Sequence, residues 1–251
     1  MVPKIIHFIW FGNKPFPPKI KKCIDSWKKY LSNYQIIQWD ESNFDINNAC
    51  QFVREAYECG QYAFVSDYVR FYVLKQYGGI YLDTDVEVIK PFKSEFLETD
   101  VALALDDGGY ISGSTIFSVP DSEFIKDCLS HYHSISFIRP DGSYENEVIN
   151  TNMQEILHAS RYRIENVYQE VDYKGEKCIF YPNEFFHVRS LSDGKMELTG
   201  NSYAIHWHTI LWASTKTKII NFLRINVLTR VLGTKLYSRI ARSIKNGKTT
   251  F

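Results

Sequence analysis

The chain lacks paired cysteines, contains no long apolar run, and has no acidic residue in its last segment. Its five cysteines are scattered and form no CxxC pair, which argues against a disulfide framework and a structural zinc site and predicts a reducing compartment. No run of eighteen apolar residues occurs, so we expect no transmembrane helix. The N-terminal sequence MVPKIIHFIWFG has no small-residue cleavage site, and we interpret it as a buried strand rather than a signal peptide.

The formal net charge of zero conceals an uneven distribution. Residues 216–251 contain nine Lys or Arg and no Asp or Glu, which leaves 20 of the 29 basic residues and all 29 acidic residues in 1–215. Apolar positions alternate with basic ones in 216–246, a pattern typical of an amphipathic basic helix or helix pair. We expect one folded domain at 1–215 and a helical tail at 216–251. The tail is expected to lie on an anionic membrane surface or to pack on the acidic body; no motif supports nucleic-acid binding.

The most informative stretch is Gln61–Phe92. Apolar and aromatic residues at three- and four-residue steps predict a helix that ends at Gly78 and Gly79. A short apolar strand then leads to Asp83 and Asp85. Residues two apart in an extended segment point the same way, so the two carboxylates should converge and bind a hard divalent cation, Mn²⁺ or Mg²⁺.

Two other interpretations of this DxD sequence stay open. A bare DxD is often only a solvated strand end. The second alternative is a phosphatase of the haloacid-dehalogenase type, which carries DxDx[TV] near its N-terminus. It is disfavoured because Glu87 occupies the last position of that pattern and the motif lies some eighty residues into the chain.

Asp67 and Arg70 lie one helical turn apart and therefore share a face of the predicted helix. A surface ion pair is the simplest explanation and would contribute little to stability. The surrounding helix is apolar on nearly all sides, however, so a charged pair on it should face a cleft. A guanidinium suits a diphosphate or sugar hydroxyls, and a carboxylate suits sugar hydroxyls.

Several isolated residues are candidates for the remaining walls of a site. Trp10 ends the first strand and either packs in the core or stacks on a nucleotide base. His206 and His208 flank Trp207 on alternate positions, so one of them is a candidate metal ligand, although buried histidines more often have structural roles. Trp212 either stacks on a sugar or packs. Asp106 or Asp107, after the predicted strand 101–105, either orients the sugar or the acceptor or belongs to a turn.

The order of predicted elements favours an α/β fold in which strands and helices alternate. The expected strands are 4–11, 34–39, 80–82, 101–105, 111–119, 177–181 and 203–207, and expected helices include 48–59, 123–133 and 147–160. No internal repeat or low-complexity linker divides residues 1–215.

Four phrases together resemble one family. They are VPKIIHFIWFG at 2–12, SDYVRFYVLKQYGGIYLDTDVEVIKPF at 66–92, YPNEFF at 181–186 and AIHWHTILW at 204–212. In this order they resemble the DXD-containing glycosyltransferases of the yeast initiation-mannosyltransferase type. That family includes bacterial capsule and lipopolysaccharide sugar transferases, and its distant relatives include the glucosylating domains of large clostridial toxins.

The resemblance implies a GT-A fold, in which a mostly parallel, Rossmann-like sheet is flanked by helices and binds a nucleotide-sugar with Mn²⁺ or Mg²⁺. It also implies roles for individual residues: Trp10 stacks on the base, Asp67 holds sugar hydroxyls, Arg70 binds the sugar or diphosphate, Asp83 contacts the ribose and the metal shell, Asp85 ligates the metal, His206 contacts the metal or diphosphate, and Trp212 closes over the donor. Family members often have HHxxxSW in the late loop. Trp207 and Leu211 depart from this pattern, and His208 or Thr209 is a candidate replacement for the lost polar contact.

The implied activity is transfer of a hexose from a nucleotide-sugar to a saccharide acceptor, with retention of anomeric configuration. UDP-galactose or UDP-glucose is the favoured donor. The acceptor, free or lipid-linked, is expected to belong to a capsule, lipopolysaccharide or exopolysaccharide. A GDP-mannose-dependent enzyme, a non-catalytic nucleotide-sugar or carbohydrate-binding module and a toxin-type transferase are the alternatives. The expected location is the cytoplasm, peripherally on the inner face of the cell membrane.

Overall fold

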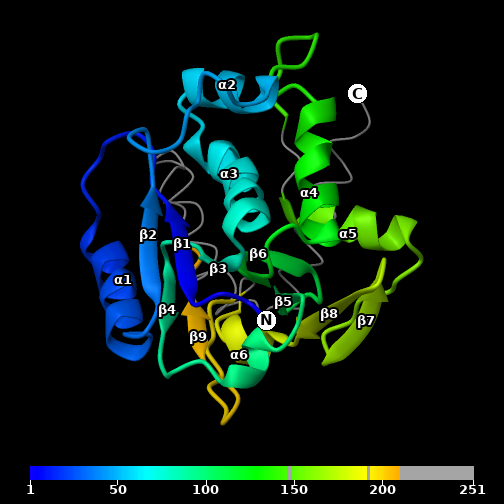
Figure 1. The fold of residues 1–251 in the computed structure, drawn as a ribbon. Helices are drawn as coiled ribbons and strands as arrows, with labels where there is room; N and C mark the ends of the chain where they lie inside the picture. The colour runs from blue at the N-terminus through cyan, green and yellow to red at the C-terminus, as the bar shows by residue number, and fades with distance from the viewer. Residues whose placement is uncertain (146–148, 191–192, 210–251) are drawn as a thin grey trace.

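The computed structural model describes residues 1–145, 149–190 and 193–209. Trp212 and the segment 216–251 lie outside the described residues. The described chain forms a central sheet with helices on both of its faces (Figure 1). The sheet has the strand order β2-β1-β3-β6-β5-β8-β7. Its strands are β1 (Ile5–Ile9), β2 (Gln35–Trp39), β3 (Gly79–Leu82), β5 (Val101–Leu105), β6 (Ile111–Ser118), β7 (Gln169–Tyr173) and β8 (Glu176–Tyr181).

Most of these strands run in one direction. β1 pairs in parallel with β2 and β3, and β5 pairs in parallel with β8. β6 runs antiparallel between β3 and β5, and β7 forms an antiparallel hairpin with β8. The predicted α/β class with a mostly parallel sheet flanked by helices is therefore confirmed. The hairpin strand β7 was not expected, because its half-exposed, polar sequence QEVDY gives a weak strand signal.

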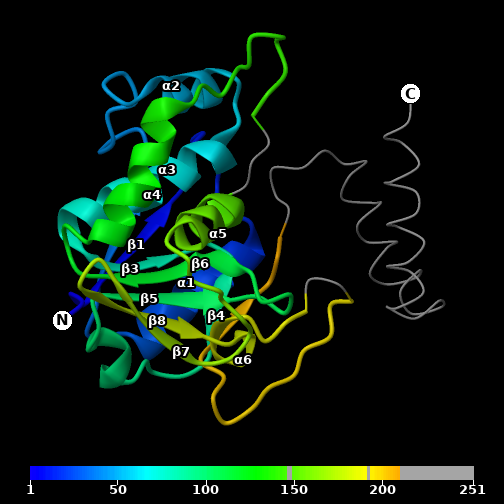
Figure 2. The ribbon, with the colours of Figure 1, turned by 90° about the vertical axis from the view of Figure 1, so that its right-hand side faces the viewer.

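Each face of the sheet has its own apolar core. One core lies beneath α2 (Gln51–Glu58), α3 (Tyr62–Tyr77), α4 (Glu123–Ser134) and α5 (Ile149–Ala159). The other lies beneath α1 (Pro18–Tyr30), the 3₁₀ helix η1 (Ser94–Leu97) and α6 (Asn183–Phe186). Figure 2 shows the group α2–α5 on one side of the sheet and α6 on the other. The sheet is thus the middle layer of an α/β/α sandwich.

A second, two-stranded sheet joins distant parts of the chain. β4 (Val86–Val88) pairs antiparallel with β9 (Ala204–His206), with Val86 opposite His206. β4 follows directly after the two aspartates, so this pairing brings the late sequence AIH beside them. The late strand predicted at 203–207 is therefore confirmed as β9, which is stabilised by its pairing with β4.

The turn between α3 and β3 requires its two glycines. Gly78 and Gly79 have φ angles of +62° and +101°, a region that residues with a side chain rarely adopt. A Cβ on Gly79 would also lie 2.6 Å from the carbonyl oxygen of Ile5. His7 of β1 donates from Nε2 to the Gly78 carbonyl at 2.9 Å and accepts at Nδ1 from Trp39 at 3.0 Å. This histidine therefore links β1, β2 and the start of β3.

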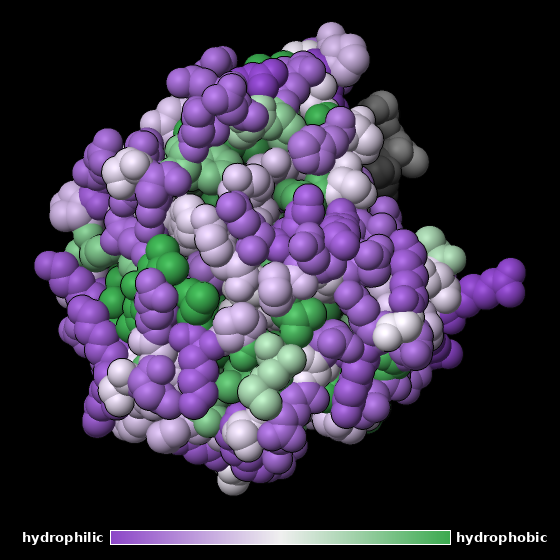
Figure 3. Space-filling model, viewed as in Figure 1, coloured by the Kyte–Doolittle hydropathy of each residue, from purple (hydrophilic) through white to green (hydrophobic). Residues whose placement is uncertain are grey.

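The molecular surface is mostly polar in the view of Figure 3, where apolar residues form small separate areas. All five cysteines have free thiols. Within the described residues, no helix combines the length and the hydropathy needed to span a bilayer.

Candidate active site

The candidate site lies at the edge of the sheet where the parallel strands end. β1, β3, β5 and β8 run in the same direction, so Trp10, Asp83 and Asp106, which follow three of them, belong to one edge. Extending the β1–β3 register places Trp10 level with Thr84, between the two aspartates. In α/β proteins with open sheets, ligands bind at this edge.

Two carboxylates and one imidazole converge at this edge. Asp83, Asp85 and His206 each offer a ligand atom, and these atoms lie within 4.8 Å of one another. His206 Nε2 is 3.2 Å from Asp85 Oδ1 and 3.9 Å from Asp83 Oδ2. Converging carboxylates repel each other unless a cation lies between them. Carboxylate oxygens with one imidazole nitrogen fit a divalent ion such as Mn²⁺ or Mg²⁺.

Asp85 is held in its ionised form by its neighbours. The side chain is buried, and its Oδ2 accepts hydrogen bonds from the Thr209 backbone N–H at 2.6 Å and the Thr209 hydroxyl at 2.8 Å. Burial alone would raise the pKa of Asp85, but the charge and hydrogen bond of His206 and the bonds from Thr209 outweigh it and hold the pKa below its usual range. The same pair acts in reverse on His206, where burial lowers the pKa and the Asp85 carboxylate raises it more.

Asp83 is oriented by groups on the other side of the cluster. Its Oδ1 accepts from the Tyr81 hydroxyl at 2.7 Å and lies 3.4 Å from Arg70 Nη1. Oδ2 is the oxygen nearer to His206. One oxygen is therefore bound by protein groups, and the second is directed toward the possible ligands of a cation.

Arg70 connects the helix to the strand that carries the aspartates. It donates from Nη2 to Asp67 Oδ1 at 2.6 Å, from Nη1 to the Gly113 carbonyl at 2.6 Å and from Nε to the Ser66 carbonyl at 3.2 Å. Its side chain is 6% exposed. Most of its N–H donors are therefore already directed at protein acceptors. In this geometry Arg70 positions Asp67 and Asp83, and it has little free surface for a diphosphate.

Asp67 is the more accessible member of this pair, with a side chain that is 14% exposed. Burial raises the pKa of Asp67 to about 7, against the opposing effect of Arg70, and the nearby Asp83 charge adds to the rise. The pKa of Arg70 is raised, because the nearby Tyr81, Asp83 and Asp67 outweigh the lowering caused by its burial. Arg70 therefore stays charged at every ordinary pH and Asp67 is the group of the pair that titrates.

The other predicted residues differ in their placement. The indole of Trp10 is half-buried, donates from Nε1 to the Lys14 carbonyl at 2.6 Å and packs on Phe16, with ring centroids 5.0 Å apart. Asp106 accepts from the backbone N–H groups of Gly108 and Tyr110, both at 2.9 Å, and so closes its own turn. Among the described residues, neither side chain forms a hydrogen bond with the carboxylate cluster, and Trp212 lies outside them.

Four groups at the site were not predicted as part of it: Tyr81, Gly113, Ser114 and His187. Tyr81 had a usable signal, since it lies two positions before Asp83 on the same strand face. Gly113 and Ser114 lie on β6, and the Ser114 carbonyl accepts from the Asp83 backbone N–H at 2.8 Å. Their role depends on strand pairing that the sequence does not specify. His187 directly follows the phrase YPNEFF, and its position next to His206 is a tertiary contact.

Trp207, the main departure from the family pattern, has clear contacts. Its backbone N–H donates to the Asp85 carbonyl at 3.1 Å, and its Nε1 donates to Glu87 Oε2 at 2.9 Å. The Lys19 ammonium lies 3.6 Å from the centre of its ring. The tryptophan thus fixes the late strand to the segment that follows the aspartates. Thr209, a candidate replacement for the missing polar contact, bonds Asp85 instead.

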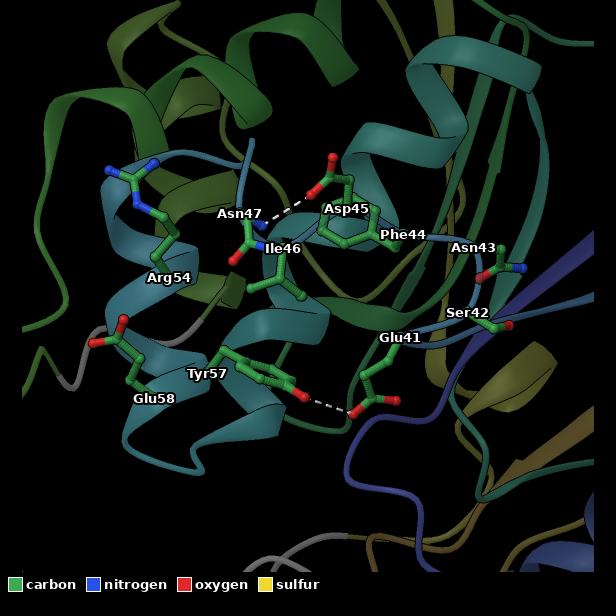
Figure 4. A pocket seen from close by; sticks show the side chains of 10 residues that line it. All are labelled: Glu41, Ser42, Asn43, Phe44, Asp45, Ile46, Asn47, Arg54, Tyr57 and Glu58. Atoms are coloured by element: carbon green, nitrogen blue, oxygen red, sulfur yellow. Dashed lines mark hydrogen bonds between the residues drawn. The ribbon is translucent and has the colours of Figure 1, made fainter.

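A cavity of about 650 Å³ lies between the loop after β2 and α2, and Figure 4 shows the side chains that line it. Its lining contains none of the predicted site residues. Glu41 in its wall accepts from the Gly12 backbone N–H at 2.7 Å and the Tyr57 hydroxyl at 3.1 Å. A second cavity of about 880 Å³ is lined by Asp107, Tyr168, Asn183 and other residues after β5 and β8. Neither lining includes Asp83, Asp85 or His206.

Comparison with known proteins shows that part of this chain is similar to glycosyltransferases. Residues 17–102 match the family described as "Glycosyltransferase sugar-binding region containing DXD motif", a range that includes Asp67, Arg70, Asp83 and Asp85. An uncharacterized glycosyltransferase of Acanthamoeba polyphaga mimivirus is 35% identical over 91 residues. That match covers 34% of this chain and 36% of the relative, so the similarity spans about a third of the relative's length.

Two solved structures are similar at a lower level. The PaToxG glycosyltransferase has a TM-score of 0.44 at 19% identity, covering 64% of this chain and 75% of that one. A glycosyltransferase involved in the glycosylation of the major capsid of PBCV-1 has a TM-score of 0.44 at 14% identity, covering 82% of this chain and 95% of that one. The match of residues 17–102 to the family model and the mimivirus relative confirm the expected resemblance to DXD-containing glycosyltransferases in that segment. The finer assignment to the yeast mannosyltransferase type stays a prediction.

Proposed function

We propose that the protein is a metal-dependent glycosyltransferase that moves a hexose from a nucleoside-diphosphate sugar, with UDP-sugars favoured, to a saccharide acceptor. The observation that carries this proposal is the convergence of Asp83, Asp85 and His206 at the carboxyl edge of the sheet. Both aspartates belong to the segment that matches the DXD-containing region. A site with this ligand set suits the diphosphate of a nucleotide-sugar together with a divalent ion.

In this proposal, Asp83, Asp85 and His206 hold Mn²⁺ or Mg²⁺. When bound, such an ion neutralises the negative charge that develops on the leaving diphosphate. Tyr81 and Arg70 hold Asp83 in place from one side, and Thr209 holds Asp85 from the other. Asp67, oriented by Arg70, is the group that accepts hydrogen bonds from hydroxyls of the donor sugar.

From the family resemblance, we propose that the transfer retains the anomeric configuration. The acceptor hydroxyl attacks the anomeric carbon on the face from which the diphosphate leaves, and the bond between that carbon and the phosphate oxygen breaks. The departing phosphate oxygen takes the proton of the hydroxyl. This route needs no nucleophile from the protein.

The physiological setting is a further part of the proposal. We assign the acceptor to a surface glycan such as capsule, lipopolysaccharide or exopolysaccharide, free or lipid-linked. The basic segment 216–251, with nine Lys or Arg and no acidic residue, would hold the enzyme on the anionic inner face of the membrane near such an acceptor.

The test is release of nucleoside diphosphate from a panel of donors, including UDP-glucose, UDP-galactose and GDP-mannose, with and without Mn²⁺. We expect one donor to be hydrolysed slowly in the presence of Mn²⁺ and the Asp85→Asn variant to lose at least about 100-fold of that rate, since even neighbours of metal ligands affect metal sites by 10- to 100-fold. Asp141→Asn, in an exposed loop, is the matched control. Binding of a nucleotide-sugar with no release would favour the binding-module alternative, and a full rate in Asp85→Asn would refute the metal assignment.

A further inference from the structure

Three histidines, His187, His206 and His208, lie close together beside the carboxylate cluster. His206 Nδ1 faces His187, whereas His206 Nε2 faces the aspartates. His187 follows α6, and His208 follows β9. One nitrogen from each ring lies within 4.8 Å of the others. His187 Nε2 is 3.2 Å from His206 Nδ1, and the His206 and His208 ring centres are 4.1 Å apart. The DXD chemistry does not require this grouping.

The outer nitrogens of two of these rings already have hydrogen-bond acceptors. His206 Nε2 lies 3.2 Å from Asp85 Oδ1, and His208 Nε2 lies 3.1 Å from the Arg189 carbonyl oxygen. A neutral imidazole has one N–H and one lone pair. When the N–H donates outward in this way, each ring keeps a lone pair at Nδ1, and the Nδ1 of His206 faces His187. A carboxylate or backbone carbonyl behind a histidine is the usual arrangement around a metal-bound imidazole.

His187 is oriented through the nitrogen that faces the cluster. The residue is 2% exposed, and its Nδ1 has no hydrogen-bond partner among the described residues. Its Nε2 lies near His206 Nδ1 and 2.6 Å from the Ser114 hydroxyl. The buried Nδ1 stays without a partner whether or not an ion is bound, so the site involves Nε2 alone, where an ion would replace the bond to Ser114.

We propose that His187, His206 and His208 form a binding site for a transition-metal ion of the zinc class, separate from the carboxylate site for Mn²⁺ or Mg²⁺. Imidazole ligands suit Zn²⁺, Cu²⁺ and Ni²⁺, whereas oxygen ligands suit Mg²⁺ and Mn²⁺. Two nitrogens bound to one tetrahedral zinc ion lie about 3.4 Å apart, close to the 3.2 Å between His187 and His206. Three protein ligands leave a fourth position open to water or an anion. The absence of CxxC pairs bears on cysteine ligands and does not argue against a histidine site.

The two sites share His206, and this has a consequence that rests on the proposed function. A neutral His206 has one lone pair, which serves either an ion at Nδ1 or an ion beside the aspartates at Nε2. Zn²⁺ in the histidine site would thus remove one ligand from the Mn²⁺ site. Occupancy of either site should weaken binding at the other.

The test is titration of the full-length, metal-free protein with Zn²⁺ followed by calorimetry, and with Co²⁺ followed by the visible spectrum that reports tetrahedral coordination. The test variants are His187→Gln and His208→Asn. Asparagine is chosen at 208 because the backbone there has φ +52°, which asparagine tolerates well. The controls are His158→Gln, an exposed histidine of α5, and Asp83→Asn, which alters only the carboxylate site.

We expect one Zn²⁺ per chain and a tetrahedral Co²⁺ spectrum in the wild type and in both controls. Each test variant should bind more than about 10-fold more weakly. Folding of each variant is checked by circular dichroism, and His208→Asn decides alone if His187→Gln does not fold. No stoichiometric binding, or unchanged binding in His208→Asn, would overturn the proposal. Loss of Zn²⁺ binding in Asp83→Asn would also overturn it, because the ion would then lie between the aspartates.

These measurements use no sugar donor, so they separate the two proposals. A histidine site that binds Zn²⁺ in a protein with no transferase activity would leave this inference standing and remove the proposed function. The linkage between the sites is read from Mn²⁺ binding, followed by electron paramagnetic resonance, at saturating Zn²⁺. Weaker Mn²⁺ binding in the wild type, but not in His208→Asn, is the expected result; equal Mn²⁺ binding with and without Zn²⁺ in the wild type would contradict the sharing of His206.

Discussion

Tyr81 donates its hydroxyl to Asp83 Oδ1 at 2.7 Å along one face of the strand that ends at the candidate metal site. The tyrosine is buried, and the Arg70 guanidinium lies 4.6 Å from the centre of its ring. The hydroxyl thus orients the metal-facing carboxylate, and the ring supports the charged group behind it. Second-neighbour contacts of this kind fix the direction of a metal ligand.

Tyr81→Phe removes the hydroxyl and keeps the ring. We expect the Mn²⁺ affinity to fall by about 10- to 100-fold and the free energy of unfolding to fall by about 1 kcal/mol, the usual contribution of one hydrogen bond. Calorimetric Mn²⁺ titration and urea unfolding measure the two effects. Tyr30→Phe, at the end of α1, is the matched control and should change neither. A stability loss with unchanged Mn²⁺ affinity would show that the hydroxyl has a structural role only.

Gly113 leaves the space that Arg70 occupies. A Cβ at this position would lie 2.9 Å from Ile149 Cγ2 and 3.0 Å from Arg70 Nη1. We expect Gly113→Ala to displace the guanidinium and to lower the free energy of unfolding by about 1–3 kcal/mol, as overpacking of a core does. The proposed transfer should fall with it, because Arg70 orients Asp67 and Asp83.

Urea unfolding and the donor-release assay measure these effects for Gly113→Ala. Gly200→Ala is the control, since a Cβ there would meet no atom within 4 Å. An unchanged free energy of unfolding in Gly113→Ala would mean that Arg70 can move without destabilising the protein. Arg70 would then not be the group that holds the two aspartates.

Arg70 provides a third test, because its guanidinium donates hydrogen bonds to three protein groups: Asp67 and the carbonyls of Ser66 and Gly113. Arg70→Lys keeps one positive charge but cannot bond Asp67 and the Gly113 carbonyl in the same geometry. Removing one partner of a buried ion pair costs about 3–5 kcal/mol, and the retained charge should make the loss for lysine smaller than that for Arg70→Met. Urea unfolding of both variants measures the order. Equal losses would indicate that the charge of residue 70 does not matter and that packing dominates.

The sequence predicted the local part of the site well, because that part depends on short spacings. Asp67 and Arg70 bond one turn apart on α3, and the Gly78–Gly79 turn leads into the strand before Asp83, as the helix and turn patterns indicated. The α/β class followed from alternating elements. These features need only the helical repeat, strand alternation and the conformational freedom of glycine.

Contacts between distant segments were harder to predict. A role for His206 beside the aspartates was expected only through the family resemblance, and the pairing of Val86 with His206 that brings it there was not predicted. The inward direction of Arg70 depends on β6, which supplies the Gly113 carbonyl, and no periodicity in the sequence indicates which strand lies there. His187 was missed for the same reason: its significance comes from a ring nitrogen 3.2 Å away on β9, and a lone histidine after an aromatic phrase gives no sign of it.

His7 gives a prediction about pH that is independent of the metal sites. Burial lowers the pKa of His7 to about 4 from 6.5, against the opposing effect of its bond to the Gly78 carbonyl. Because the folded-state pKa is the lower one, the unfolded chain takes up the proton first as the pH falls. The neutral His7 therefore contributes stability above about pH 6.5, and that contribution is lost as the pH falls toward 4. The shift corresponds to about 3 kcal/mol.

His7→Gln tests this prediction, since an amide can accept from Trp39 and donate to the Gly78 carbonyl without titrating. The free energy of unfolding in urea is measured at pH 7 and pH 4.5 for the wild type, His7→Gln and the exposed control His158→Gln. The wild type and the control should lose more stability between the two pH values than His7→Gln, by about 2–3 kcal/mol. Other buried histidines contribute equally to all three proteins, so the difference isolates His7. Equal losses in all three would mean that His7 is protonated in the folded protein at pH 4.5, and that its bonds to Trp39 and Gly78 do not hold the first three strands together as a neutral ring.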